Sequence, residues 1–213
     1  MIEIIPAILT NDPGELEDRI KQVERLAHRV QVDIIDGVFA NNRTVALESL
    51  EGIGTEALLD VHLMVYEPDS WVERAVRILA DRIIGQVEMM SDQVRFIGHA
   101  QEIGSKVGLA LDLPTPVSAI DPAIINNLDV VLLMSVKAGF GGQEFNKSAL
   151  EKIKALDEIR SRDSIPFRIC VDGGINAQNI GRIRRAGADE AAIGRSLFAG
   201  DLAKNIERLK KTE

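Results

Sequence analysis

Two aspartates, Asp33 and Asp172, stand in or at the end of a short apolar segment near its carboxyl end. A carboxylate at the end of a buried strand is costly in free energy unless it has a partner or a function. Two carboxylates on opposite sides of a substrate can remove a proton from one face and return one to the other face. The two acids therefore predict a two-base proton transfer, and structural ion pairing of each acid is the alternative interpretation.

His62 lies in another apolar segment, Asp-Val-His-Leu-Met. An imidazole nitrogen and carboxylate oxygens together form a ligand set that suits Zn, Fe or Mn. With acids at neighbouring strand ends, His62 indicates a candidate divalent-metal site. The alternative is a histidine that is only hydrogen-bonded within the core.

Glycines are concentrated in three segments that each follow an apolar run: Gly139, Gly141 and Gly142, then Gly173 and Gly174, then Gly194. Because glycine has no Cβ, an anion can approach the backbone N–H groups of such segments closely. Barrel enzymes often bind phosphate with the loops after strands seven and eight. The spacing therefore predicts a phosphate site, to which Arg195 could add a charge-assisted hydrogen bond. Turns and helix ends are the alternative for any single glycine.

Eight short apolar segments alternate with segments of helical periodicity along the 213 residues. The apolar segments are nearly continuous, as in parallel strands that are covered on both faces. Eight βα units predict a single (β/α)8 barrel domain over residues 1–213. An open doubly wound sheet is the competing architecture, but the first strand lacks the G-x-G-x-x-G turn of a dinucleotide site. The predicted strands are Ile2–Leu9, Val30–Ile35, Leu58–Val65, Arg82–Val87, Val107–Leu111, Leu128–Met134, Phe167–Val171 and Glu190–Ile193.

The periodic segments between these strands predict the helices of the barrel. Two of them are short: a helical patch over Glu48–Glu56 and a short helix over Ile120–Ile125. The other helices are expected around the apolar positions of the stretches 16–26, 71–79, 94–103, 150–159, 180–186 and 202–209.

Composition excludes several classes of protein. A net charge of −8 argues against nucleic acid as a general partner. Cys170 is the single cysteine, so no intramolecular disulfide forms, and its apolar neighbours favour a buried thiol over a nucleophile. No N-terminal signal peptide is recognisable and no run of about 18 apolar residues occurs, so no membrane span is predicted. We therefore expect a cytoplasmic protein.

Several segments resemble the ribulose-phosphate 3-epimerase family and occur in the family's order along nearly the whole chain. They are Val32–Phe39, Asp60–Val65, Gly108–Pro116, Leu133–Gln143, Val171–Ile175, Ala186–Asp189 and Gly194–Phe198. The resemblance implies a barrel enzyme that interconverts ribulose 5-phosphate and xylulose 5-phosphate. It also implies an enediolate intermediate held by a divalent metal, commonly zinc, iron or manganese. Relatives in this family form dimers and hexamers, which leaves a homo-oligomer open.

The resemblance also implies roles for individual residues. The family's two catalytic acids align with Asp33 and Asp172, and its metal ligands align with these acids, His62 and the position of Gln31. The residues expected to bind a small phosphorylated ketose are Met64, Met134, Ser135, Gly139, Gly141, Gly142, Gly173, Gly174, Gly194 and Arg195.

Departures from the family pattern are concentrated near the chemistry. The family has histidine where this chain has Gln31, serine where it has Ala7, and Asn-Pro where it has Lys137-Ala138. An amide oxygen is a weaker ligand for zinc than imidazole, so Gln31 could weaken metal binding, change the metal, or accompany metal-free chemistry. Two alternatives to the pentose reaction follow: a 3-epimerase of another ketose phosphate, such as a ketohexose 6-phosphate, or a catalytically silent phosphosugar-binding barrel.

Overall fold

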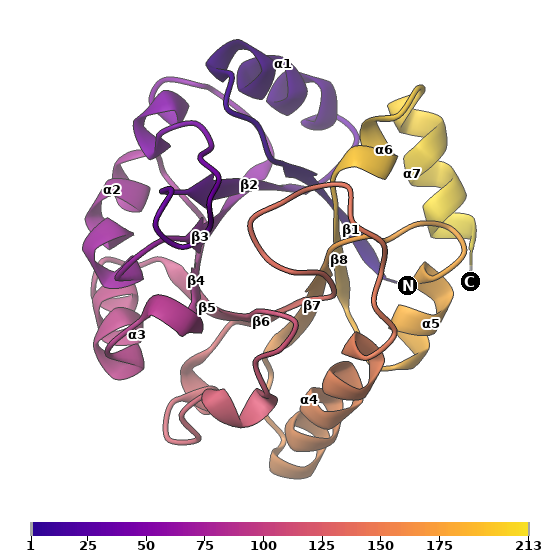
Figure 1. Cartoon of the computed structure of the whole chain (residues 1–213). Coiled ribbons are helices and arrows are strands. Elements are labelled where there is room, and N and C mark those ends of the chain that lie inside the picture. The colour runs from indigo at the N-terminus through magenta and orange to yellow at the C-terminus, as the bar shows by residue number, and fades with distance from the viewer. Residues whose placement is uncertain (1, 213) are drawn as a thin grey trace.

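A closed barrel of eight parallel strands forms the centre of the molecule, in a computed structural model that describes residues 2–212 (Figure 1). The strands follow one another in chain order, and β8 pairs with β1 to close the barrel. The predicted (β/α)8 fold is therefore confirmed, while Met1 and Glu213 of the predicted domain lie outside the described residues. The strands are β1 (Glu3–Ile8), β2 (Arg29–Ile35), β3 (Leu58–Met64), β4 (Arg82–Gln86), β5 (Lys106–Leu111), β6 (Val130–Met134), β7 (Arg168–Asp172) and β8 (Glu190–Ile193).

Helices surround the barrel on its outer side (Figure 1). They are α1 (Pro13–Val23), α2 (Val72–Arg77), α3 (Gln93–Glu102), α4 (Ala149–Asp163), α5 (Ile180–Arg185), α6 (Arg195–Phe198) and α7 (Leu202–Lys211). Short 3-10 segments complete the connections: η1 (Leu47–Leu50), η2 (Pro68–Trp71), η3 (Val87–Met89), η4 (Val117–Ala119) and η5 (Ile125–Asn127). Among residues 2–212, no helix has both the length and the apolar character that spanning a membrane requires.

Two predicted helices are wrong. The stretch Glu48–Glu56 contains only the last three residues of η1, because Glu51 is already extended and Gly52, with a φ of 79°, turns the chain away. The stretch Ile120–Ile125 follows η4 and reaches only the first residue of η5, and Pro122 within it disfavours a helical conformation for the residue before it. The short helix α6 was not predicted, since four residues are too few to show a period.

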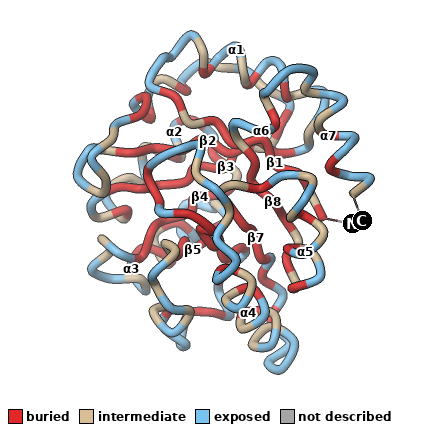
Figure 2. Tube along the Cα trace, turned by 45° about the vertical axis from the view of Figure 1, so that its right-hand side comes forward, coloured by how far each residue is buried: buried red, intermediate tan, exposed pale blue. Residues whose placement is uncertain are grey.

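Apolar side chains pack on both faces of the strands, whose trace is almost wholly buried (Figure 2). The larger cluster joins the outer strand faces to the helices, and the smaller one fills the barrel interior with residues such as Ile84, Leu132 and Cys170. Burial raises the pKa of the Cys170 thiol well above its usual value. The prediction of a buried thiol is thereby confirmed.

The amino ends of the strands hold a buried network of charged residues. Arg82 is its centre, with Nε 3.0 Å from Asp60 Oδ1 and Nη2 2.8 Å from Glu190 Oε2. Arg29 pairs with Asp60 and places Nη1 2.7 Å from Asp81 Oδ2. These ion pairs stabilise the amino end of the barrel and leave the chemistry to the opposite end.

Candidate functional site

A cavity of about 1260 Å³ opens at the carboxyl ends of the strands. This is the end at which (β/α)8 enzymes carry their active sites. Most residues expected from the sequence line the cavity: Asp33, Met64, Met134, Gly139, Gly141, Gly142, Asp172, Gly173, Gly174, Gly194 and Arg195. The barrel topology therefore brings together strand ends that are far apart in sequence.

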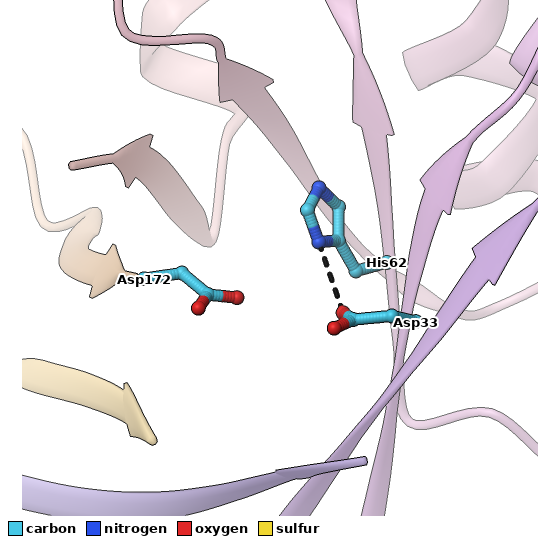
Figure 3. A group of neighbouring side chains, drawn as sticks. All are labelled: Asp33, His62 and Asp172. Carbon is cyan, nitrogen blue, oxygen red and sulfur yellow. Dashed lines mark hydrogen bonds and ion pairs between the residues drawn. The ribbon is translucent and has the colours of Figure 1, made fainter. Parts of the chain in front are cut away.

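Asp33, His62 and Asp172 form a group of neighbouring side chains (Figure 3), of which the two aspartates line the cavity. Each offers one ligand atom, and these atoms all lie within 4.8 Å of one another. Asp33 and His62 are neighbours in the register of β2 and β3, with Asp33 Oδ1 3.2 Å from His62 Nδ1. Asp172 points at this pair from β7, on the other side of the group (Figure 3).

Gln31 lies between the two aspartates and is fully buried. Its amide nitrogen donates to Asp33 Oδ1 at 2.8 Å and to Asp172 Oδ2 at 2.7 Å. Its amide oxygen is buried without a hydrogen-bond partner among the described residues. A buried polar atom without a partner is costly, so this oxygen marks a place where a further group would be stabilised.

The donor set is chemically suited to a divalent cation. Rotating the Gln31 amide by half a turn would point its oxygen at both carboxylates, which repel it unless a cation lies among them. Such a cation would face oxygens of Gln31, Asp33 and Asp172 and one nitrogen of His62. Carboxylate, amide and imidazole ligands are those that divalent metals take in proteins, so the residues present fit the metal that the sequence predicted.

The environment of Asp172 changes its acidity. Burial, and then the negative charge of Asp33, raise the pKa of Asp172 to about 7, while His62 and Gln31 act in the opposite direction. Ionisation of Asp172 is unfavourable because it would place a second negative charge in a buried site beside Asp33. An acid that titrates near neutrality can accept and donate protons at physiological pH.

Several positions in the glycine loops are packed too tightly to carry a side chain. Gly142 has a φ of 79°, and a Cβ at this position would lie 2.2 Å from Arg195 Nη1. A Cβ on Gly174 would lie 2.3 Å from the backbone nitrogen of Phe145. The loop after β6 thus lies directly against Arg195 and the loop after β7. A Cβ on Gly141, in the same loop, would meet nothing within 4 Å.

Three predicted site residues do not line the cavity. Gln31 and His62 lie beneath it, in contact with the two aspartates. Ser135 is fully buried, and its hydroxyl donates to the backbone carbonyl of Asp172 at 2.9 Å. Ser135 thus fixes the end of β7, and its contact with substrate stays a prediction, as do the roles of the other site residues.

Two residues near the site, Asn42 and Gln86, were not expected from the sequence. Asn42 donates to the carbonyl of Gly139 at 2.7 Å and so joins the loop after β2 to the loop after β6. Gln86 at the end of β4 lies 3.2 Å from His62 Nε2. The position of Gln86 at a strand end was the available signal, but a glutamine shows no specific chemistry until its partners are known.

The chain resembles known proteins over almost its full length. Residues 3–198 match the model of the Ribulose-phosphate 3 epimerase family. A ribulose-phosphate 3-epimerase of Bacillus subtilis is 35% identical over 218 residues, covering 99% of both chains. The enzyme of that name from Escherichia coli is 35% identical over 212 residues, covering 97% of this chain and 94% of its own.

Solved structures with the same fold are more distant in sequence. A 3-keto-L-gulonate-6-phosphate decarboxylase from Vibrio cholerae has a TM-score of 0.72 at 11% identity, covering 99% of this chain and 96% of its own. A phosphoribosyl anthranilate isomerase from Thermococcus kodakaraensis has a TM-score of 0.66 at 15% identity, covering 100% of this chain and 98% of its own. At these identities the likeness extends to the barrel fold alone.

Proposed function

The chain belongs to the ribulose-phosphate 3-epimerase family, whose members are isomerases, and we propose from this premise that it interconverts ribulose 5-phosphate and xylulose 5-phosphate. The observation that carries the proposal is the pair of buried carboxylates, Asp33 on β2 and Asp172 on β7, which converge on one amide nitrogen of Gln31. Epimerisation at C3 needs a base on one face of the sugar and an acid on the other. Two strands on different sides of a barrel mouth supply such a pair.

In the proposed reaction, one aspartate removes the C3 proton and the other delivers a proton to the opposite face. The reverse reaction exchanges the two roles, so each acid must hold a proton in one direction and lack it in the other. A pKa of about 7 for Asp172 supports this, because both of its protonation states are then populated near neutrality. Gln31 orients both carboxylates through its amide nitrogen.

We propose that Asp33, His62, Asp172 and Gln31 hold a divalent metal, which when bound supplies positive charge to the oxygens of an enediolate. Three oxygen donors and one nitrogen form a harder ligand set than one with two imidazoles. Such a set shifts preference from Zn²⁺ toward Mn²⁺ or Fe²⁺. The unpartnered Gln31 oxygen supports its inclusion among the ligands.

The phosphate of the substrate is proposed to bind at the loops after β6, β7 and β8. Gly142 lets Arg195 pack against the loop after β6, and Gly174 lets that loop pack against the loop after β7. Gly142, Gly174, Gly194 and Arg195 all line the cavity, where backbone N–H groups and a guanidinium group can bind an anion. Met64 and Met134 are buried and line the same cavity as the two aspartates. Their apolar side chains would keep water away from the carbanion that forms at C3.

A ketohexose 6-phosphate is the second candidate substrate. Ala7 lines the cavity at the position where the family has serine, so one hydroxyl that could bind a sugar oxygen is missing. The cavity, at about 1260 Å³, also leaves room for a sixth carbon. A panel of ketose phosphates would separate this candidate from the pentose reaction by comparing kcat/KM.

Proton NMR of ribulose 5-phosphate in D2O tests the proposed function directly. With Mn²⁺-loaded protein, deuterium should enter C3 while xylulose 5-phosphate appears, and Asp172→Asn should abolish the formation of xylulose 5-phosphate. A strong chelator, followed by dialysis, should stop the exchange, because the proposed metal supplies charge to the enediolate. Absence of exchange in protein supplied with Mn²⁺, Fe²⁺ or Zn²⁺ would contradict the proposal and favour another ketose phosphate or a silent binder.

A further inference from the structure

Gln86 is a buried polar residue that the proposed proton transfer does not use. It ends β4, is fully buried, and its side-chain amide lies 3.2 Å from His62 Nε2. The other ring nitrogen of His62, Nδ1, faces Asp33. Gln86 therefore lies behind the imidazole, on the side away from the two aspartates.

The other neighbours of Gln86 determine how its amide is oriented. With the oxygen toward the imidazole, the amide nitrogen donates to the Ala110 carbonyl at 3.0 Å and to Glu88 Oε2 at 2.7 Å. The opposite orientation would set the amide oxygen against a carbonyl and a carboxylate, which accept hydrogen bonds only. Ala110 and Glu88 thus leave the amide oxygen for His62, where it can only accept from Nε2–H.

Glu88 is itself held in place by the backbone just after β5. Its Oε1 accepts a hydrogen bond from the backbone nitrogen of Asp112 at 2.7 Å. Lys152 on α4 donates to the carbonyl of Asp112 at 2.8 Å. A continuous chain of hydrogen bonds therefore runs from α4 through the end of β5 to Glu88, Gln86 and His62.

We infer that Gln86 is a positioning residue that keeps the proton of His62 on Nε2 and so leaves the lone pair of Nδ1 directed at the candidate metal site. The ligating nitrogen of a metal-bound histidine is commonly selected in this way, by the hydrogen bond that the other nitrogen makes. The alternative tautomer would put a proton on Nδ1, where it would bond to Asp33 and block the lone pair. The inference rests on the proposed metal-assisted site, but its test needs no substrate.

The tautomer of His62 can be read by NMR of protein labelled with ¹⁵N in the imidazole rings. The chain has three histidines, so His62→Gln assigns the His62 signals by their disappearance. At mildly alkaline pH and without metal, we expect Nε2 to carry the proton. Addition of Zn²⁺ should then shift the Nδ1 resonance, while Nε2 keeps its proton.

Gln86→Met removes the acceptor at nearly constant volume. The Nδ1–H form should then become populated, and the affinity for Mn²⁺ should fall about 10- to 100-fold, as for other residues that orient a ligand. Gln93→Met makes the same chemical change on α3, where Gln93 bonds to the Ala119 carbonyl, and should leave tautomer and affinity unchanged. Glu88→Ala, at an exposed position, should shift both readouts in the direction of Gln86→Met by a smaller amount.

Two results would overturn the inference. One is a neutral wild-type His62 that carries its proton on Nδ1. The other is an unchanged His62 tautomer and an unchanged Mn²⁺ affinity in both Gln86→Met and Glu88→Ala. If Gln86→Met does not fold, Glu88→Ala alone still tests the inference. A wild-type protein with the expected tautomer but no epimerase activity would contradict the proposed function and support the assignment of Gln86.

Discussion

Gln31 Nε2 on β2 lies 2.7 Å from Asp172 Oδ2 on β7, although 141 residues separate the two positions in sequence. The same nitrogen is 2.8 Å from Asp33 Oδ1. A neutral amide donor thus lies between two carboxylates, a place where a metal cation would also be stabilised. The amide reduces the repulsion between the acids but keeps its own oxygen unpartnered.

Gln31→His is expected to raise the affinity for Zn²⁺ by at least about tenfold, or about 1.4 kcal/mol, because imidazole is a better zinc ligand than an amide oxygen. Competition with a chromophoric chelator measures this affinity. Gln22→His, on the exposed face of α1, adds a histidine outside the cavity and serves as the control. An unchanged zinc affinity in Gln31→His would show that position 31 does not contribute a ligand.

Gly142→Ala should weaken phosphate binding. At a φ of 79° its Cβ would be 2.2 Å from Arg195 Nη1, so either the loop or the guanidinium group must move. We expect KM for the ketose phosphate to rise by about tenfold or more, since a charge-assisted hydrogen bond contributes about 1.5–3 kcal/mol. Inhibition by inorganic phosphate should weaken in parallel.

Gly141→Ala is the matched control for this experiment. Gly141 has no positive φ, and a Cβ there would meet nothing within 4 Å. Its KM should therefore stay at the wild-type value. Equal changes in KM for the two variants would indicate that loop flexibility matters, and not the position of Arg195.

The fold and the central acids could be predicted because they depend on repeated local patterns. Eight apolar segments give eight strands, and closure of the barrel then brings Asp33, His62 and Asp172 to one end. The fit of Gln86 against His62 could not be predicted. Its role depends on Ala110 and Glu88, which orient its amide and which only the folded barrel places around it.

Connections outside the strands were harder to predict for a different reason. The stretches Glu48–Glu56 and Ile120–Ile125 have apolar residues at helical spacing, but Gly52 and Pro122 interrupt them. The contact between Gly142 and Arg195 joins two loops that share no local pattern. Local helix breakers decide the first feature, whereas tertiary packing decides the second and leaves no periodic signal in the sequence.

Asp172 should make the stability of the metal-free protein depend on pH. Its pKa is raised from 3.8 to about 7 on folding, so the folded protein holds this proton more tightly than the unfolded chain. The resulting stabilisation is complete below the unfolded value and is lost as pH rises through the folded value. Between about pH 4 and pH 7 the unfolding free energy should therefore fall with a slope of up to about 1.4 kcal/mol per pH unit.

Asp172→Asn removes this titration while keeping the size of the side chain. Urea denaturation in chelator, at a series of pH values, gives the difference in unfolding free energy between wild type and variant. As pH rises, the unfolding free energy of the wild type should fall relative to that of the variant. Above neutrality the variant should be the more stable protein. A difference that is constant with pH would contradict the raised pKa.

Arg82→Met should destabilise the fold without changing the chemistry. Arg82 bonds to Asp60 and Glu190 at the amino end of the barrel, and its loss leaves two buried carboxylates with fewer partners. Removing one partner of a buried ion pair costs about 3–5 kcal/mol, which denaturant unfolding measures. Arg162→Met, in an exposed pair with Asp163, should leave the unfolding free energy unchanged. The C3 exchange rate of folded Arg82→Met should equal that of the wild type, because the candidate site lies at the opposite end of the strands. A lower rate would mean that the charged network also positions the two aspartates.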